Sequence, residues 1–333
     1  MADLSDENDL SLLHALQIAP RAPWTQLATP LGLSAATAAR RWSAIVERGD
    51  AWISGYITAR GMSSGAMVEI DCAPDAVSEV AVDIALLPKA VSIETTSGGR
   101  DLLVTFVSRS IPDLSSGLAA IGQIDGVRKV RGNLITSIFV NAAGWRLDAL
   151  DPEREDMIRL LAPPVPSGRA RQLDHLDEAL SVALSQDGRA AAAALAQSLS
   201  VSINTVRRRI AGLLDCGTLE IRCEVARAVT GHELAVTLWL VVPPPDLVDY
   251  ARRVSRMREA RLVVSVAGRY NLLVTAWLRH AADLPDFEAR LTRAAAGVRI
   301  GDRAVVLRTV KQVGRLLDAT GRAQTAVPID VWN

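Results

Sequence analysis

The sequence predicts an α+β protein in which two winged-type helix-turn-helix domains alternate with two ferredoxin-like βαββαβ domains. Three observations lead to this fold class. The second half of the chain repeats the first, each half starts with helical segments, and each half continues in a β-α-β-β-α-β order. The 333 residues suffice for about two ordinary domains or several small ones.

The composition indicates a soluble globular chain, because 49% of the residues are hydrophobic and 22% are charged. The polar start, MADLSDENDL, and the lack of any stretch of about 18 apolar residues predict a cytoplasmic protein without a membrane partner. Lys+Arg and Asp+Glu both total 37, so nucleic-acid binding must rest on local patches. The three cysteines form no ligand cluster with the four histidines, so no metal or cofactor is expected.

The first part of each half repeats without gaps. Residues 27–53, LATPLGLSAATAARRWSAIVERGDAWI, align with residues 195–221, LAQSLSVSINTVRRRIAGLLDCGTLEI. The identical pairs are Leu27/Leu195, Ala28/Ala196, Leu31/Leu199, Ser34/Ser202, Thr37/Thr205, Arg40/Arg208, Arg41/Arg209, Gly49/Gly217 and Ile53/Ile221. The same register pairs Asp6 with Asp174 and Asp9 with Asp177. The arginine run at 207–209 is therefore one copy of a repeated feature.

A second repeat follows, in which GGRDLLVTFVSR (98–109) aligns with GRYNLLVTAWLR (268–279). From both repeats we assign residues 1–60 and 171–228 to helix-turn-helix domains and residues 61–142 and 229–314 to ferredoxin-like domains. Residues 143–170 form a linker with a short helix after Asp151-Pro152, and residues 315–333 form a tail that we expect to be poorly ordered.

Each helix-turn-helix domain, called a head from here on, is expected to hold three helices. Asp6 and Asp9 open the first helix of the first head, where acidic residues are favourable. A second helix covers residues 24–31, and Pro30 should truncate it because proline lacks an N–H and its ring clashes. Ser34 and Ser202 should cap the third helix of each head.

The third helix of each head should end at a glycine, Gly49 or Gly217, in a left-handed turn. We expect the consecutive pairs Ile45-Val46 and Leu213-Leu214 to face inward.

Short helices joined by a tight turn, with arginines one to two turns into the last helix, are typical of a helix-turn-helix. The first turn of a recognition helix reaches base edges, and later residues reach phosphates. The candidate DNA-binding residues are Ser34, Ala35, Thr37, Arg40 and Arg41 in the first head and Ser202, Asn204, Thr205, Arg207, Arg208 and Arg209 in the second. Solvated arginines on an amphipathic helix are the alternative, but recurrence at fixed offsets favours DNA binding. Pro30 and Ala39 weaken the first head, so we expect the second head to bind DNA more strongly.

The strands of each ferredoxin-like unit should form a sheet with helices on one face, so the open face should pack on a second such sheet. Gly98 with Asp101, and Gly268 with Asn271, mark a hairpin between the middle strands. Their residue types suit a turn capped by an Asx side chain, and they also suit a backbone site for a small amphoteric ligand. Both interpretations remain open.

With these motifs together, the chain resembles the Lrp/AsnC (feast/famine) family of prokaryotic transcriptional regulators, in a tandem-fused form. The matching residues are Leu-Ala-x-x-Leu-x-[Leu/Val]-Ser-x-x-Thr-x-x-Arg-Arg and Gly-x-x-[Asp/Asn]-Leu-Leu-Val-Thr. The resemblance implies double-stranded DNA as a partner, sheets that pair into dimers, and an amino acid or related effector near Gly98, Asp101, Gly268 and Asn271. Gly99 and Arg269 stand where family members often carry an acidic residue.

The leading hypothesis is a sequence-specific regulator, not an enzyme, in which one chain supplies both heads of a pseudo-dimer and the fused chains associate further. Its operator should be an imperfect palindrome with half-sites about one helical turn, roughly 34 Å, apart. The alternative is a tetrapyrrole enzyme similar to siroheme decarboxylases, with His232 and His280 in its second ferredoxin-like unit. A scaffold with degenerate heads is a third possibility.

Overall fold

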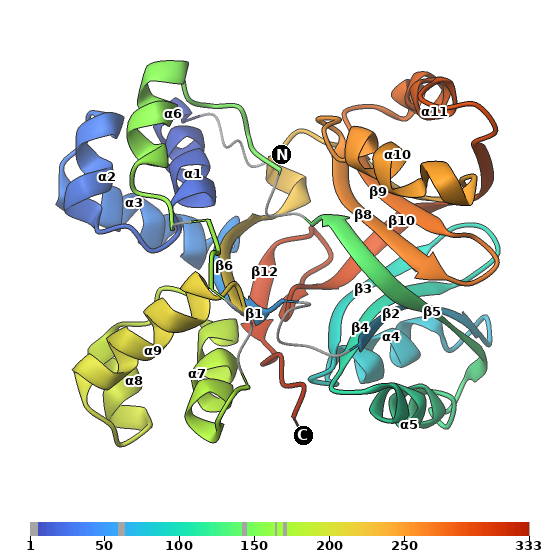
Figure 1. The fold of residues 1–333 in the computed structure, drawn as a ribbon, viewed down its shortest axis with the longest axis horizontal. Coiled ribbons are helices and arrows are strands. Elements are labelled where there is room, and N and C mark those ends of the chain that lie inside the picture. The colour runs from blue at the N-terminus through green and yellow to red at the C-terminus, as the bar shows by residue number, and fades with distance from the viewer. Residues whose placement is uncertain (1–5, 59–63, 142–144, 164, 169–171, 333) are drawn as a thin grey trace.

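A computed structural model of the chain describes residues 6–58, 64–141, 145–163, 165–168 and 172–332. Two helical heads lie on one side of the molecule and a strand-rich body lies on the other (Figure 1). The α+β class and the alternation of heads with ferredoxin-like units are confirmed. The domain boundaries expected at 60–61, 142–143 and 170–171 lie outside the described residues.

The two heads have the same element order. The first head consists of α1 (Glu7–Ile18), α2 (Trp24–Leu31), α3 (Ala35–Glu47) and β1 (Ala51–Ile57). The second consists of α7 (His175–Gln186), α8 (Ala192–Ser198), α9 (Ile203–Asp215) and β6 (Leu219–Val225). The turn between the last two helices of each head leads directly into the recognition helix, α3 or α9.

Both recognition helices begin and end as expected. The Ser34 hydroxyl accepts the Thr37 N–H at 3.0 Å, and the Ser202 hydroxyl accepts the Thr205 N–H at 3.1 Å. Gly49 and Gly217 follow the helices with φ of 71° and 65°, a conformation that favours glycine.

Two details of the heads differ from expectation. Pro30 does not truncate α2, which has 8 residues against 7 in α8, because Pro30 lies in the last turn and costs one backbone hydrogen bond there. Val46 does not face inward: it is 42% exposed, whereas Ile45 is fully buried. Successive helical residues point about 100° apart, so the narrow contact with the core admits only one of them.

The heads are joined by a two-stranded antiparallel ribbon of β1 and β6, in which Ser54 lies opposite Arg222. One hydrophobic core runs through both heads, with Leu12 and Leu16 from the first and Leu184 and Val206 from the second. The expected linker helix is α6 (Pro152–Arg159), whose Ile158 is buried in the same core. The two heads therefore share one hydrophobic core.

The ferredoxin-like units supply the body. The first unit consists of β2 (Ser64–Cys72), α4 (Val77–Ala85), β3 (Ala90–Thr96), β4 (Leu102–Ser108), α5 (Ile111–Ile121) and β5 (Val127–Val140). The second consists of β7 (Leu234–Val241), α10 (Leu247–Val254), β8 (Ala260–Ala267), β9 (Leu272–Leu278), α11 (Leu284–Arg293) and β10 (Arg299–Gln312).

The two sheets meet at their edges and close into a barrel, in the strand order β10-β3-β4-β2-β5-β8-β9-β7 and back to β10. The long strands β5 and β10 make the joins, because each pairs with its own unit along one part and with the other unit along the next. The open faces are therefore covered by each other inside the barrel, where Met67, Leu103, Trp239 and Leu273 pack together. The long helices lie outside (Figure 1).

The expectation of a poorly ordered tail is wrong. Strands β11 (Arg315–Leu317) and β12 (Ala323–Ala326) continue the sheet beyond β10. The Ala323 N–H donates to the Gly49 carbonyl at 2.8 Å, and Arg322 forms an ion pair with buried Asp50 at 2.8 Å. Apolar residues after β12, such as Ile329, are buried against the barrel, which explains the order of the tail. None of the described helices is long and apolar enough to cross a bilayer.

Candidate nucleic-acid interface and hairpins

The recognition helices present polar side chains to solvent. Ser34 and Arg40 of the first head are exposed, as are Ser202, Asn204, Arg207 and Arg208 of the second, and Ala35 is half-buried. Arg40, Arg207 and Arg208 form no hydrogen bond or ion pair within the described part of the chain. Their guanidinium groups are therefore available for an external anion.

Arg41 and Arg209 are held by their own heads. Arg41 Nη1 lies 2.5 Å from Asp6 and 2.8 Å from Asp9, and Arg209 Nη1 lies 2.6 Å from Asp174. The hydrogen bond from Arg41 lowers the pKa of Asp6. The DNA contacts expected of Arg41 and Arg209 stay predictions, and both guanidinium groups already have partners within their own heads. The sequence contained the signal, because the aspartates recur in the same register as the arginines.

The first turns of the recognition helices also form local contacts. The hydroxyl oxygens of Ser34 and Thr37 lie 2.8 Å apart, and those of Ser202 and Thr205 lie 2.9 Å apart. These residues fix the start of each helix. Asn204 is exposed in the first turn of α9, and its amide carries both a donor and an acceptor.

The Asx side chains of the hairpins form structural contacts, but with the end of an adjacent strand rather than with the turns that they were expected to cap. The Asp101 carboxylate accepts the Cys72 N–H at 2.7 Å. The Asn271 amide accepts the Val242 N–H at 2.9 Å and donates to the Val242 carbonyl at 2.7 Å. Each side chain therefore fastens its hairpin to the end of the first strand of its own unit.

The hairpin glycines lie against the opposite unit. A Cβ added to Gly98, whose φ is 94°, would lie 3.2 Å from the Arg303 carbonyl. A Cβ added to Gly268 would overlap the side-chain oxygen of Asn133. Of the four sequence-predicted residues, Gly98 and Gly268 thus lie at the joins between the two units, whereas Asp101 and Asn271 contact their own units.

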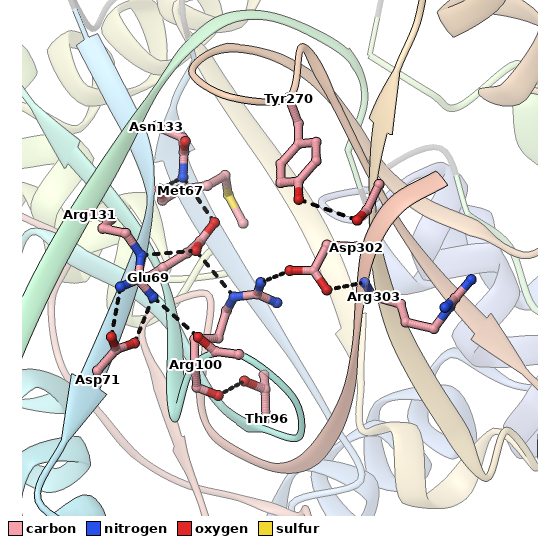
Figure 2. Close-up of polar contacts among 12 residues, drawn as sticks. Met67, Glu69, Asp71, Thr96, Arg100, Arg131, Asn133, Tyr270, Asp302 and Arg303 are labelled. Atoms are coloured by element: carbon pink, nitrogen blue, oxygen red, sulfur yellow. Dashed lines mark hydrogen bonds and ion pairs between the residues drawn. The ribbon is translucent and has the colours of Figure 1, made fainter. Parts of the chain in front are cut away.

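Arg100 is a residue of this region that sequence reasoning missed. Figure 2 shows its guanidinium between Glu69 and Asp302, where it forms an ion pair with each, at 3.2 Å in the case of Glu69. It also stacks over Trp239 at 3.8 Å from the ring centre. The available signal was an asymmetry of the repeat, in which Arg100 of the first unit aligns with Tyr270 of the second.

Nearby charges complete the same network. Arg131 pairs with Asp71 at 2.6 Å and with Glu69 at 3.4 Å, and the Tyr270 hydroxyl donates to the Gly301 carbonyl at 3.3 Å (Figure 2). This end of the barrel is filled by the protein's own ion pairs. The described residues contain no cluster of His, Cys, Asp or Glu that could hold a metal ion.

The exposed arginines and the paired units together define a class of protein: two helix-turn-helix heads carried on a barrel of ferredoxin-like units. Residues 6–44 match the AsnC-type helix-turn-helix domain, and residues 65–144 match the Lrp/AsnC ligand binding domain. The HTH-type transcriptional regulator LrpA of Pyrococcus horikoshii is 31% identical over 132 residues, which cover 38% of this chain and 92% of the relative. The chain belongs to the Lrp/AsnC family.

Two further proteins are similar to this chain, one over less than half of its length and one over nearly all of it. An uncharacterized HTH-type transcriptional regulator of Pyrococcus furiosus is 25% identical over 146 residues, which cover 44% of this chain and 98% of the relative. The crystal structure of the siroheme decarboxylase NirDL superposes with a TM-score of 0.61 at 14% identity, covering 92% of this chain and 93% of that one. At this identity the likeness concerns the fold alone, over nearly the whole of both chains.

Proposed function

We propose that the chain binds double-stranded DNA in a sequence-dependent manner and regulates transcription in response to an amino acid or related metabolite. The observation that carries the proposal is that Arg40, Arg207 and Arg208 are exposed on recognition helices and have no partner among the described residues. Arginines that neutralise phosphates release counterions from DNA, which supplies affinity independent of sequence. Family membership supports the same conclusion.

The second head has the fuller set of contacts. Asn204 carries the amide that pairs well with an adenine edge in the major groove. Arg207 and Arg208, one turn further along α9, would contact phosphates. The first head offers Ala36, Ala39 and Arg40 at these places, so we propose that it contributes less affinity and less base discrimination.

The ribbon of β1 and β6 fixes the two heads to each other within one chain. We propose that they contact half-sites about 34 Å apart, and that the operator is an imperfect palindrome because the two helices differ in sequence. Fused chains would associate further into homo-oligomers. The hairpin tips offer the effector one contact, through backbone groups of Gly98 and Gly268, since the side chains of Asp101 and Asn271 are already bonded.

The test is DNase footprinting and fluorescence anisotropy with the DNA upstream of the chain's own gene, in a fixed salt concentration. The proposal expects two protected segments about one helical turn apart and tighter binding than to a duplex of shuffled sequence. Equal affinity for the two duplexes would remove the sequence-specific part of the proposal. No binding to either would remove the DNA-binding assignment.

A second candidate is a tetrapyrrole enzyme, which the whole-chain fold likeness to NirDL favours. His232 lies beside Trp145, with ring centres 5.6 Å apart, and is the half-buried histidine of the second ferredoxin-like unit. The absorbance spectrum of the chain after incubation with an iron uroporphyrin decides this alternative. A shifted Soret band that is lost in His232→Ala would support it, and an unchanged spectrum would exclude it.

A further inference from the structure

A cavity of about 360 Å³ lies inside the barrel at the end that faces the ribbon and the C-terminal tail. Barrel strands form its walls, while Tyr56 of β1, Glu224 of β6 and Ile329 of the tail lie at its other side. Its volume falls in the range of about 300–1,000 Å³ that is usual for small-molecule sites. It is separate from the opposite barrel end, which the ion pairs of Arg100 fill.

The lining of the cavity is mostly apolar, with residues such as Leu103, Val107 and Ile135, and it also includes charged groups. Two of these groups are carboxylates, those of Glu94 and Glu224, and the Glu224 carboxylate already has partners. Glu224 forms an ion pair with Arg222 and accepts a hydrogen bond from Gln312 Nε2 at 2.9 Å. The hydrogen bond between Gln312 and Glu224 fastens the ribbon to β10.

The other carboxylate, Glu94 on β3, has no hydrogen-bond or ion-pair partner among the described residues. Burial raises the pKa of Glu94 to about 7, although the positive charges of Arg227 and Arg261 oppose this effect. The Glu94 side chain is half-buried. A partly desolvated carboxylate without a donor gains from a ligand that supplies one.

Arg261 on β8 offers the complementary charge. Its side chain is 7% exposed, stacks 3.9 Å above the Trp277 ring, and lies 3.5 Å from Glu224. It forms no hydrogen bond within the described chain, so its guanidinium keeps unused N–H donors. Burial lowers the pKa of Arg261 to about 10, which leaves it charged near neutral pH.

We propose that this cavity binds a small molecule with an apolar body that carries both an amine and an acidic group. The amine pairs with Glu94, the acid pairs with Arg261, and the apolar body packs against Leu103 and Ile135. Glu94 has no donor among the described residues, and Arg261 keeps N–H donors beyond its ion pair with Glu224. A ligand that carries both an amine and an acid can therefore use both groups, whereas a ligand with one of them uses only one.

The location of the cavity links such a ligand to the heads. Tyr56, Arg222 and Glu224 belong to the ribbon that joins the two heads, and they line the same space as Glu94 and Arg261. An occupant therefore contacts the barrel and the ribbon at once, and it favours one orientation of the heads over others. This coupling rests on the proposed DNA-binding function, whereas binding to the cavity does not.

Binding is measured by isothermal titration calorimetry with the full chain, using L-leucine and L-phenylalanine as probes. The matched analogues are 3-methylbutylamine, which lacks the acid of leucine, and 4-methylpentanoate, which lacks its amine. We expect at least one amino acid to bind and both analogues to bind at least about tenfold more weakly, as loss of a charged hydrogen bond predicts. No binding by either amino acid, or equal binding by the analogues, would overturn the ligand class.

The location is tested with variants. Glu94→Gln keeps the shape and removes the charge, and Thr105→Phe fills the cavity from β4. We expect each to weaken binding at least about tenfold, and the exposed Glu79→Gln to have no effect. Circular dichroism checks that each variant folds. Binding unchanged in Glu94→Gln and Thr105→Phe would place the ligand elsewhere, such as at the hairpins, and overturn the proposal.

The coupling is tested separately by anisotropy on the operator. The bound amino acid should change DNA affinity of the parent chain but not of Thr105→Phe. Ligand binding without any DNA binding would remove the proposed function and leave the cavity site standing. DNA binding without ligand binding would remove the cavity site and leave the proposed DNA-binding function standing.

Discussion

Arg209 Nη1 donates a hydrogen bond to the Asp174 carboxylate at 2.6 Å, which ties the recognition helix α9 to the start of α7. Arg41 and Asp6 repeat this contact in the first head, at 2.5 Å. Because the same pair recurs in both heads, it belongs to the internal structure of a head. The neighbouring Arg207 and Arg208 are exposed and have no such partner in the part of the chain that the structure describes. Within this run, Arg209 therefore stabilises the head, while Arg207 and Arg208 remain available for an external anion.

Replacing Arg209 should destabilise the second head. Arg209→Ala removes the guanidinium from Asp174 and from fully buried Asp177, so we expect the free energy of unfolding to fall by about 1–2 kcal/mol. Urea titration followed by circular dichroism measures the change. In a double-mutant cycle with Asp174→Ala the losses should be less than additive. Arg208→Ala is the control, and an equally large loss there would contradict the assignment.

Replacing the free arginines should weaken DNA binding without regard to sequence. We expect Arg207→Ala with Arg208→Ala to lower affinity for specific and shuffled duplexes alike. The slope of log K against log salt should fall by about 2, since each phosphate contact contributes about 0.9. Anisotropy titrations at several salt concentrations give the slope. The control is Arg253→Ala with Arg256→Ala, exposed residues on and just after α10, outside the heads. An unchanged slope in the α9 variant would refute phosphate contacts.

Replacing Asn204 should change base preference instead. Loss of a bidentate contact to one base costs about 1–3 kcal/mol of discrimination at that position. Asn204→Ala should therefore bind duplexes with any base at one operator position almost equally, and still bind shuffled DNA as the parent does. Competition with singly substituted duplexes measures this. A uniform loss of affinity over all duplexes would instead indicate that Asn204 only supports the helix.

The sequence predicts those parts of the fold that short-range rules determine. Ser34, Ser202, Gly49 and Gly217 act within a few residues of their own positions, so their types and spacing suffice to place the recognition helices. The duplication adds a second copy of each signal and makes the alternation of heads and units evident. The candidate DNA-binding surface follows from these same helices.

Other features depend on partners far apart in the chain. The barrel closes because β5 and β10 each pair with both units, and periodicity within a strand does not reveal a strand's second partner. The tail is ordered by contacts with the first head, near Asp50. Arg100 and Glu94 look like ordinary turn and strand residues in sequence, and only the closed barrel brings them to its two ends.

Lys311 provides a prediction about pH. It is fully buried on β10, and its Nζ donates to the Leu87 carbonyl at 3.1 Å. Burial lowers the pKa of Lys311 from 10.5 to about 7. Between these values the unfolded chain binds the proton and the folded chain does not, so this group makes the protein more stable as the pH rises.

Lys311→Met removes the cost of burying an amine and keeps much of its volume, so we expect the variant to be more stable than the parent at pH 7. That advantage should shrink by up to about 1.4 kcal/mol for each pH unit between about 7 and 10, because only the parent gains stability from deprotonation. Urea titrations of both proteins at pH 7, 8 and 9 measure the difference. Lys129→Met, at an exposed lysine, should show no such trend. An advantage of Lys311→Met that stays constant with pH would mean that the buried amine keeps its proton in the folded chain.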